Sequence, residues 1–195
     1  MYFSYLLSAL LATLAIASPL TSNPDDEPAG LTARAVVDTK EFTAALAAHP
    51  GLTNGQVVWF SLEWALTVPV GDGDVESQTE LQQLQAKLGF DHIGVVAGTV
   101  KETTTGKGKN QNTKRDFDAQ LFHMIKTNAN PGDTALKTHN WAVVPGQTLK
   151  FGGVTSAKKI TNAKKAAKDY VDAHKIYAVN GNNCNDFAQT VIKQL

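Results

Sequence analysis

Residues 181–195 read Gly-Asn-Asn-Cys-Asn-Asp-Phe-Ala-Gln-Thr-Val-Ile-Lys-Gln-Leu and contain Cys184, the only cysteine of the 195-residue sequence. The apolar residues Phe187, Val191 and Leu195 are spaced four apart, which predicts an amphipathic helix that begins near Cys184. Because the N–H groups and the dipole of a helix start stabilise a thiolate and lower its pKa, a thiol there can act as a nucleophile. We therefore expect Cys184 to be catalytic; the alternative is a buried cysteine that packs as a small apolar residue.

The other end of the chain predicts export. Residues 1–17 are almost wholly apolar and end in Ala15-Ile16-Ala17, a small-residue pattern typical of signal-peptide cleavage. The stretch is short for a bilayer span, so we expect a secreted protein with no integral membrane span. Residues 18–37 are rich in Pro, Asp, Thr and Ala and are predicted to be disordered or a pro-segment. Residues 38–195 have the size of a single domain.

The spacing of apolar residues along this domain alternates between helical and extended patterns. It predicts helices over residues 39–48, 77–88, 156–174 and from 184 onward, and strands over residues 56–68, 90–100, 118–126, 140–144 and 149–154. The polar stretch 101–114 is predicted to be a long exposed hairpin loop. This order of elements indicates an α+β fold in which an antiparallel sheet is packed with helices.

Charge is unevenly distributed although the net charge is zero. Residues 1–100 carry eleven acidic and three basic side chains, whereas residues 101–195 carry seven acidic and fifteen basic ones. The basic half could favour an anionic surface such as phospholipid headgroups or acidic polysaccharide. A solvated helix face together with a loop explains the same pattern. No aromatic residues interleave with the basic ones, so nucleic-acid binding is not expected.

A thiol nucleophile needs a base, normally a histidine. Of the five histidines, His92, His123 and His139 lie in or at the start of predicted strands. A histidine among apolar strand residues is often a satisfied core residue, and spacing alone does not choose among these three. No histidine or cysteine stands at zinc-ligand spacing from Cys184, so neither a metal nor another cofactor is expected.

Two stretches resemble the circularly permuted papain-like superfamily, which includes lecithin retinol acyltransferase-like enzymes and PPPDE-type peptidases. In those families an apolar strand that opens with His precedes, by many tens of residues, a helix that opens with Asn-Cys. The first element corresponds here to Asp91-His92-Ile93-Gly94-Val95-Val96, and the second to residues 177–187, Tyr-Ala-Val-Asn-Gly-Asn-Asn-Cys-Asn-Asp-Phe. The acyltransferase-like branch also places a second histidine on the next strand, and His123 matches that place.

The resemblance implies a permuted papain-like fold with the nucleophile on the C-terminal helix. His92 would take the proton from Cys184, and the thiolate would attack an amide or ester carbonyl to form a thioester. His123, or alternatively Asn140, would orient the His92 imidazole. The implied function is that of a secreted cysteine hydrolase, thiol protease or acyltransferase. Its substrate would be a peptide, a cell-wall amide or a lipid.

Two features depart from this pattern. Asn185 and Asp186 follow the cysteine where the acyltransferase-like branch has an acid and a histidine, and a nearby acid opposes thiol ionisation. The arrangement of His139 and the strands that follow it resembles that of the PPPDE-type peptidases. In that alignment His139 would be the base. We favour His92, because the alternative leaves only 44 residues between base and nucleophile.

A second class of function is a secreted non-enzymatic binding or host-interaction protein on the same fold. In that case the aromatic residues Trp59, Trp64 and Trp141, together with the basic patches, would contact a ligand.

Overall fold

The computed structural model describes residues 35–66, 80–127 and 132–195, so the predicted signal peptide and most of the predicted pro-segment lie outside the described residues. The described helices are α1 (Lys40–Ala48), α2 (Glu80–Leu88), α3 (Ala157–Ala173) and α4 (Cys184–Ile192), with a 3-10 turn η2 at Gly108–Asn110. The strands are β1 (Ala35–Asp38), β2 (Val57–Trp64), β3 (His92–Thr105), β4 (Asn112–Lys126), β5 (Thr134–Asn140) and β6 (Gln147–Val154). The α+β class is confirmed.

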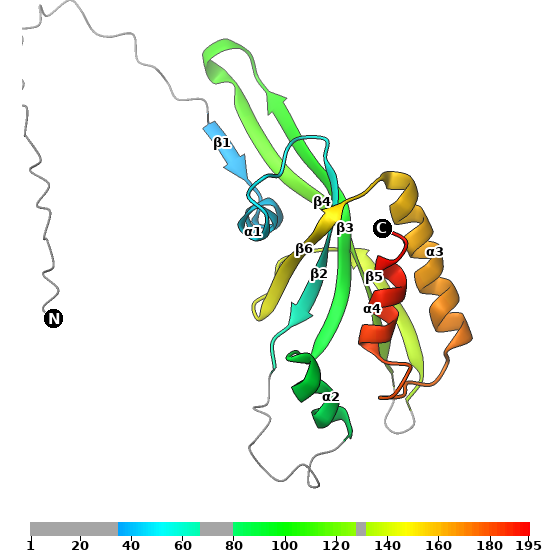
Figure 1. The fold of residues 1–195 in the computed structure, drawn as a ribbon. Helices are drawn as coiled ribbons and strands as arrows, with labels where there is room; N and C mark the ends of the chain where they lie inside the picture. Colours follow the sequence, from blue (N-terminus) through cyan, green and yellow to red (C-terminus); the bar gives the residue numbers. More distant parts are fainter. Residues whose placement is uncertain (1–34, 67–79, 128–131) are drawn as a thin grey trace, which may run out of the picture. The chain divides into compact units, whose positions relative to one another are not determined.

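The six strands form one sheet in the order β1-β4-β3-β2-β6, and β5 also pairs with β4 (Figure 1). The pairs of β2 with β3 and β6, and of β4 with β3 and β5, are antiparallel. Strand β1 instead runs parallel to the first residues of β4, with Ala35 opposite Asn112. The sheet is therefore mixed, and the expectation of a purely antiparallel sheet is wrong at this edge. Strand β1 also includes residues 35–37, which the sequence had assigned to the pro-segment.

Alternating side chains divide the core between the two faces of the sheet. Ile93 and Val95 of β3 pack with Phe187 in one buried cluster that includes residues of α3 and α4, and we call this side the α4 face. Val96 packs with Phe42 of α1 in the second cluster, on what we call the α1 face. This is the period-two pattern of a sheet covered on both sides.

Local sequence signals explain where most helices begin. The Thr39 side chain accepts the N–H of Phe42 at the start of α1, and the Ser156 side chain accepts the N–H of Lys159 at the start of α3. Such caps satisfy N–H groups that have no partner within the helix. Helix α4 begins at Cys184 as predicted, and the side chains of Phe187, Val191 and Leu195 are buried.

The predicted loop over residues 101–114 is wrong. Strand β3 continues to Thr105 and β4 begins at Asn112, so the turn is only six residues long and contains Gly106 at a positive φ of 82°. The polar side chains of this hairpin are mostly exposed, and Figure 1 shows that it extends beyond the helices. Backbone pairing of β3 with β4, such as Thr104 opposite Thr113, maintains the strands without apolar packing.

The predicted strand at 140–144 is wrong as well. Strand β5 ends at Asn140, and the N–H of Trp141 makes a 2.8 Å hydrogen bond to the Ala119 carbonyl. After this point residues 142–146 leave the sheet and turn at Gly146, whose φ of 80° suits glycine. In the described part of the chain, no helix has the length and apolar character needed to cross a membrane.

Candidate functional site

Cys184 is the first residue of α4, and a capping box fixes it there. The side-chain oxygen of Asn183 accepts the N–H groups of Asn185 at 2.9 Å and Asp186 at 3.1 Å. In return, the Asp186 carboxylate accepts the N–H of Asn183 at 3.2 Å. Asp186 thus has a structural role at the helix start, which accounts for an acid so close to the cysteine.

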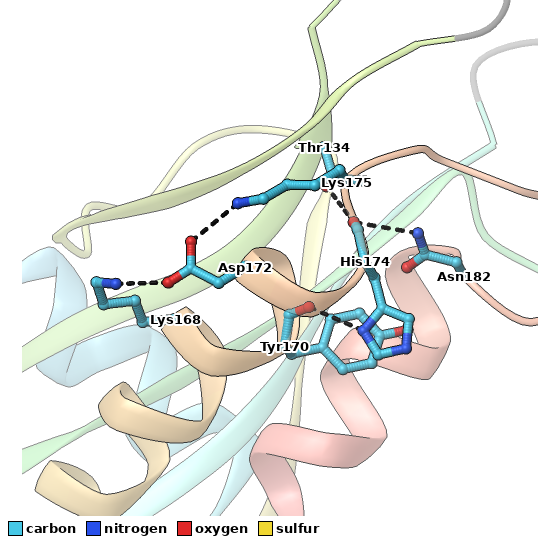
Figure 2. A network of polar contacts seen from close by, with 7 residues as sticks. All are labelled: Thr134, Lys168, Tyr170, Asp172, His174, Lys175 and Asn182. Atoms are coloured by element: carbon cyan, nitrogen blue, oxygen red, sulfur yellow. Dashed lines mark hydrogen bonds and ion pairs between the residues drawn. The ribbon is translucent and has the colours of Figure 1, made fainter.

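The turn that precedes Cys184 is tied to α3 through Asn182. The Asn182 amide donates to the carbonyl of His174 (Figure 2). It also donates to the carbonyl of Ile176, and the Asn182 backbone pairs with that of Ala178. The Thr134 hydroxyl, at the start of β5, donates to the same His174 carbonyl. The start of β5 and the end of α3, which are distant in sequence, therefore fix the position of the turn that precedes Cys184.

The basic residues of α3 are partly neutralised by acids of the same segment. Lys168 and Lys175 both pair with Asp172, as Figure 2 shows, and Lys165 pairs with Asp169. The lysines next to Asp172 lower its pKa to about 2. This arrangement fits the solvated helix face that the charge pattern allowed.

The Cys184 thiol lies on the α4 face and is 4% exposed. Burial raises its pKa, while hydrogen bonding to the Ile93 backbone and to the Tyr177 hydroxyl acts in the opposite direction. The sequence-based expectation that the helix start lowers the thiol pKa is wrong here, because desolvation outweighs the N–H groups and the dipole. Burial raises the pKa of the Tyr177 hydroxyl as well, and the interaction with Cys184 adds to this.

The structure brings His92 and His123 together. The Nε2 of His92 lies 2.9 Å from the Nδ1 of His123, and the two rings lie against Trp64, with centroids at 4.7 Å and 5.5 Å from its ring. The ring of His139, an exposed residue of β5, is 5.7 Å from that of His123. Burial lowers the pKa of both His92 and His123 to about 4. Both imidazoles are therefore neutral at pH 7.

Gly94 makes room for this histidine pair. A Cβ at Gly94 would lie 2.8 Å from the Leu121 side chain and 3.1 Å from the Cβ of His123. His92, Gly94 and His123 therefore share the α1 face, to which Leu121 belongs. Only glycine at this position leaves His123 uncrowded.

The thiol and the histidine pair lie on opposite faces of the sheet. Ile93 packs with Cys184 on the α4 face, and His92, the preceding residue, contacts Trp64, which packs on the α1 face. The groups that affect the thiol pKa in the described structure are Tyr177 and nearby backbone, and no histidine is among them. Cys184 therefore contacts Ile93, the residue next to His92 in β3, but makes no described contact with His92 itself.

The sequence did not predict that Tyr177 contacts the Cys184 thiol or that Trp64 packs against His92. Tyr177 stands in the quoted stretch, seven residues before Cys184, but only the fold shows that its hydroxyl reaches the thiol. Trp64 meets His92 because these two residues are paired across β2 and β3. That register depends on pairing between distant strands, which spacing along one strand does not reveal.

Among the residues that the structure describes, no three or more His, Cys, Asp or Glu side chains gather where they could hold a metal ion. In comparisons with known proteins, no family model, no curated protein and no solved structure matches this chain.

Proposed function

We propose that the chain is a secreted cysteine hydrolase or acyltransferase with a permuted papain-like arrangement, which cleaves an amide or ester through a thioester. The observation that carries this proposal is the 2.9 Å contact between His92 Nε2 and His123 Nδ1. When Nε2 of His92 donates to His123, the Nδ1 of His92 carries the lone pair of a general base. His123 is then a positioning residue that fixes the tautomer and the ring orientation.

The reaction begins with a neutral thiol and a neutral imidazole. As the Cys184 sulfur attacks the carbonyl carbon, His92 Nδ1 accepts the thiol proton, and a C–S bond forms. The carbon–nitrogen or carbon–oxygen bond to the leaving group then breaks, and His92 returns the proton to that group. Water or an amine attacks the thioester, releases the acyl group and restores the thiol. A raised thiol pKa and a lowered His92 pKa favour proton transfer during attack over a resting ion pair.

This mechanism requires Cys184 to approach His92. The thiol contacts the backbone of Ile93, the residue next to His92, but the two side chains lie on opposite faces of the sheet, so attack requires a rearrangement of β3 or α4. Catalytic hydrogen bonds are often long before substrate binds. The N–H groups of Asn185 and Asp186 donate to Asn183, and the N–H of Cys184 contacts the Tyr177 hydroxyl, so stabilisation of an oxyanion by the Cys184 N–H requires the substrate to displace that hydroxyl.

A second candidate is the non-enzymatic binding or host-interaction protein. It is favoured by the 4% exposure of Cys184 and by the separation of Cys184 and His92 onto opposite faces. In this alternative, the histidines and the cysteine serve only packing. The proposal of export rests on residues 1–17 alone.

A substrate screen tests the enzymatic proposal. The purified chain is incubated with peptide, peptidoglycan and phospholipid substrates, and Cys184→Ala is the blank for each. We expect turnover of one class, abolished in Cys184→Ala and reduced about 100-fold or more in His92→Ala. Turnover that survives in Cys184→Ala, or turnover of no substrate class, contradicts the proposal and favours the binding protein.

A further inference from the structure

Three histidines and a lysine gather on the α1 face, around the pairing of β4 with β5. The His123 ring centroid lies 5.2 Å from that of His92 and 5.7 Å from that of His139. Lys137 of β5 is directly opposite His123, so the two side chains leave the sheet on the same face. We call these four residues the histidine cluster: His92, His123, Lys137 and His139.

The hydrogen bond inside the cluster requires neutral imidazoles. In the 2.9 Å contact of His92 Nε2 with His123 Nδ1, one nitrogen must donate and the other must accept. When both rings are protonated, no acceptor remains and two positive charges face each other. His139 and Lys137 add to the repulsion at His123. Among the described residues, no carboxylate acts on either imidazole, although Asp91 precedes His92 in the chain.

The neighbouring elements supply no charge that would compensate for protonation. Strand β2 contributes the neutral ring of Trp64, and β6 contributes Gln147, which is paired with Trp64. Glu63 precedes Trp64 in β2 and therefore faces the other side of the sheet. The carboxylate of Glu41, on α1, lies at the N–H of Val143. A protonated cluster would consequently be a site of unbalanced positive charge.

Strand β5 connects the histidine cluster to the turn that precedes Cys184. In the described part of the chain, β5 pairs with no strand other than β4. At the start of β5, the Thr134 hydroxyl donates to the His174 carbonyl (Figure 2). Just before β5, the Gly132 carbonyl accepts the N–H of Tyr177 at 2.9 Å. Since the Tyr177 hydroxyl contacts the Cys184 thiol, β5 supports the residue that contacts the thiol.

We propose that the histidine cluster is an acid-sensitive switch that controls access to Cys184. Protonation of both His92 and His123 breaks their shared hydrogen bond, and repulsion within the cluster separates β5 from β4. The turn that carries Tyr177 then loosens, and the Cys184 thiol becomes accessible while the rest of the fold persists. This inference concerns exposure of the thiol and does not rest on the proposed reaction, so failure of either leaves the other intact.

The switch operates between about pH 6.5 and pH 4. In the closed form, burial lowers the pKa of His92 and of His123 to about 4, whereas a solvated histidine has a pKa of about 6.5. The open form therefore binds more protons in this window. Its population rises as the pH falls, by up to about tenfold per pH unit for each histidine that takes up a proton.

Thiol exposure in the natural full chain tests the switch. The probe is 2,2′-dithiodipyridine, which still reacts with thiols in acid, and the rate at Cys184 is divided by that of N-acetylcysteine at the same pH. Because both thiols are almost fully protonated in this range, the ratio reports access. We expect it to rise about tenfold or more between about pH 6.5 and pH 4.5, with the far-UV circular dichroism of the folded chain retained. A constant ratio overturns the proposal, as does a rise that accompanies complete loss of the dichroism signal.

Amide exchange in the same chain locates the opening. At about pH 5, exchange is measured by mass spectrometry and corrected for the intrinsic rate at that pH. Exchange should be faster in β5 than in β2 and β3. Equal exchange across the sheet indicates global unfolding and overturns a local switch.

Exposed residues of β5 provide the variants. Lys137→Glu places a carboxylate opposite His123, which stabilises the protonated ring in the closed form, so opening should move to lower pH by about half a unit. His139→Gln removes one repelling group and should shift the midpoint in the same direction. Lys107→Glu makes the same charge reversal at an exposed residue of the β3–β4 hairpin and should leave the midpoint unchanged. Opening at higher pH in Lys137→Glu, or an equal shift in Lys107→Glu, contradicts the proposal.

Discussion

The Nε2 of His92 lies 2.9 Å from the Nδ1 of His123, although 31 residues separate them in the chain. The contact forms because β3 and β4 are paired and because Gly94 leaves space beside His123. Burial keeps both imidazoles neutral, with pKa values of about 4. One imidazole can then orient the other, which is the basis of the proposed reaction and of the first prediction.

Stability should fall on acidification between about pH 6.5 and pH 4. A histidine has a pKa of about 6.5 in the unfolded chain and a lower one in the folded chain, so the unfolded state binds more protons in this window. The limiting slope for one histidine is about 1.4 kcal/mol of unfolding free energy per pH unit, and the partly exposed His123 contributes less than this limit. Urea unfolding of the natural chain and of His123→Gln across this range measures it. The variant should have the shallower slope, and parallel curves would refute the lowered pKa values.

Two glycines of β3 should differ in their tolerance of alanine. A Cβ at Gly98 would lie 2.2 Å from the Asp118 carbonyl oxygen and 2.4 Å from the Ala119 Cα, which are backbone atoms. At Gly94 the nearest atom is a flexible side-chain end, Leu121 Cδ1, at 2.8 Å. Gly98→Ala should therefore cost about 3 kcal/mol or more, and Gly94→Ala about 1–2 kcal/mol. Thermal unfolding measures both, and an equal loss in the two variants would be inconsistent with this strand spacing.

The capping box should stabilise α4. Asn183→Ala removes the acceptor of two N–H groups and a donor to the Val179 carbonyl, so we expect a loss of about 1–2 kcal/mol in urea unfolding. Asn185→Ala is the matched control, because only the backbone N–H of Asn185 takes part in the cap. A control variant as unstable as Asn183→Ala would argue against the cap.

The Cys184 thiol of the free protein should titrate above the ordinary thiol pKa of about 8.5. Iodoacetamide alkylation across pH 6–11 measures the midpoint. Tyr177→Phe should raise it further, because the Tyr177 hydroxyl donates to the sulfur and favours the thiolate. Tyr170→Phe serves as the control, since Tyr170 packs on Phe187 and is not among the groups that act on the thiol. A midpoint below 8.5, or a downward shift in Tyr177→Phe, would disprove this environment.

Local sequence patterns predicted the helices best. The caps Thr39 and Ser156 mark the starts of α1 and α3, and the apolar spacing after Cys184 marks the start of α4. All three signals involve residues that are close together in the chain. The predicted loop over residues 101–114 and the predicted strand over residues 140–144 were wrong, because pairing with another strand determines where β3, β4 and β5 begin and end. Polar composition led to a loop over 101–114, whereas backbone pairing with β4 extends β3 through Thr105.

The candidate site was predictable only in part. The residue types and their order suggested Cys184, His92 and His123, and the structure unites the two histidines. The sequence did not predict that Cys184 and His92 lie on opposite faces of the sheet. Successive residues of a strand point to opposite faces, so Ile93 packs beside Cys184 while His92 contacts Trp64. Desolvation of the thiol could not be predicted from the sequence either, because it depends on how α4 packs against β3.

Acyl-enzyme formation tests the central claim most directly. The full chain is mixed at pH 7 with p-nitrophenyl butyrate, and the bound butyryl group is followed by intact mass and located by peptide mapping. We predict one butyryl group on Cys184, formed about 100-fold or more slowly in His92→Ala and at nearly the natural rate in His139→Ala. Absence of the adduct, or an adduct that forms equally fast without His92, would contradict the account.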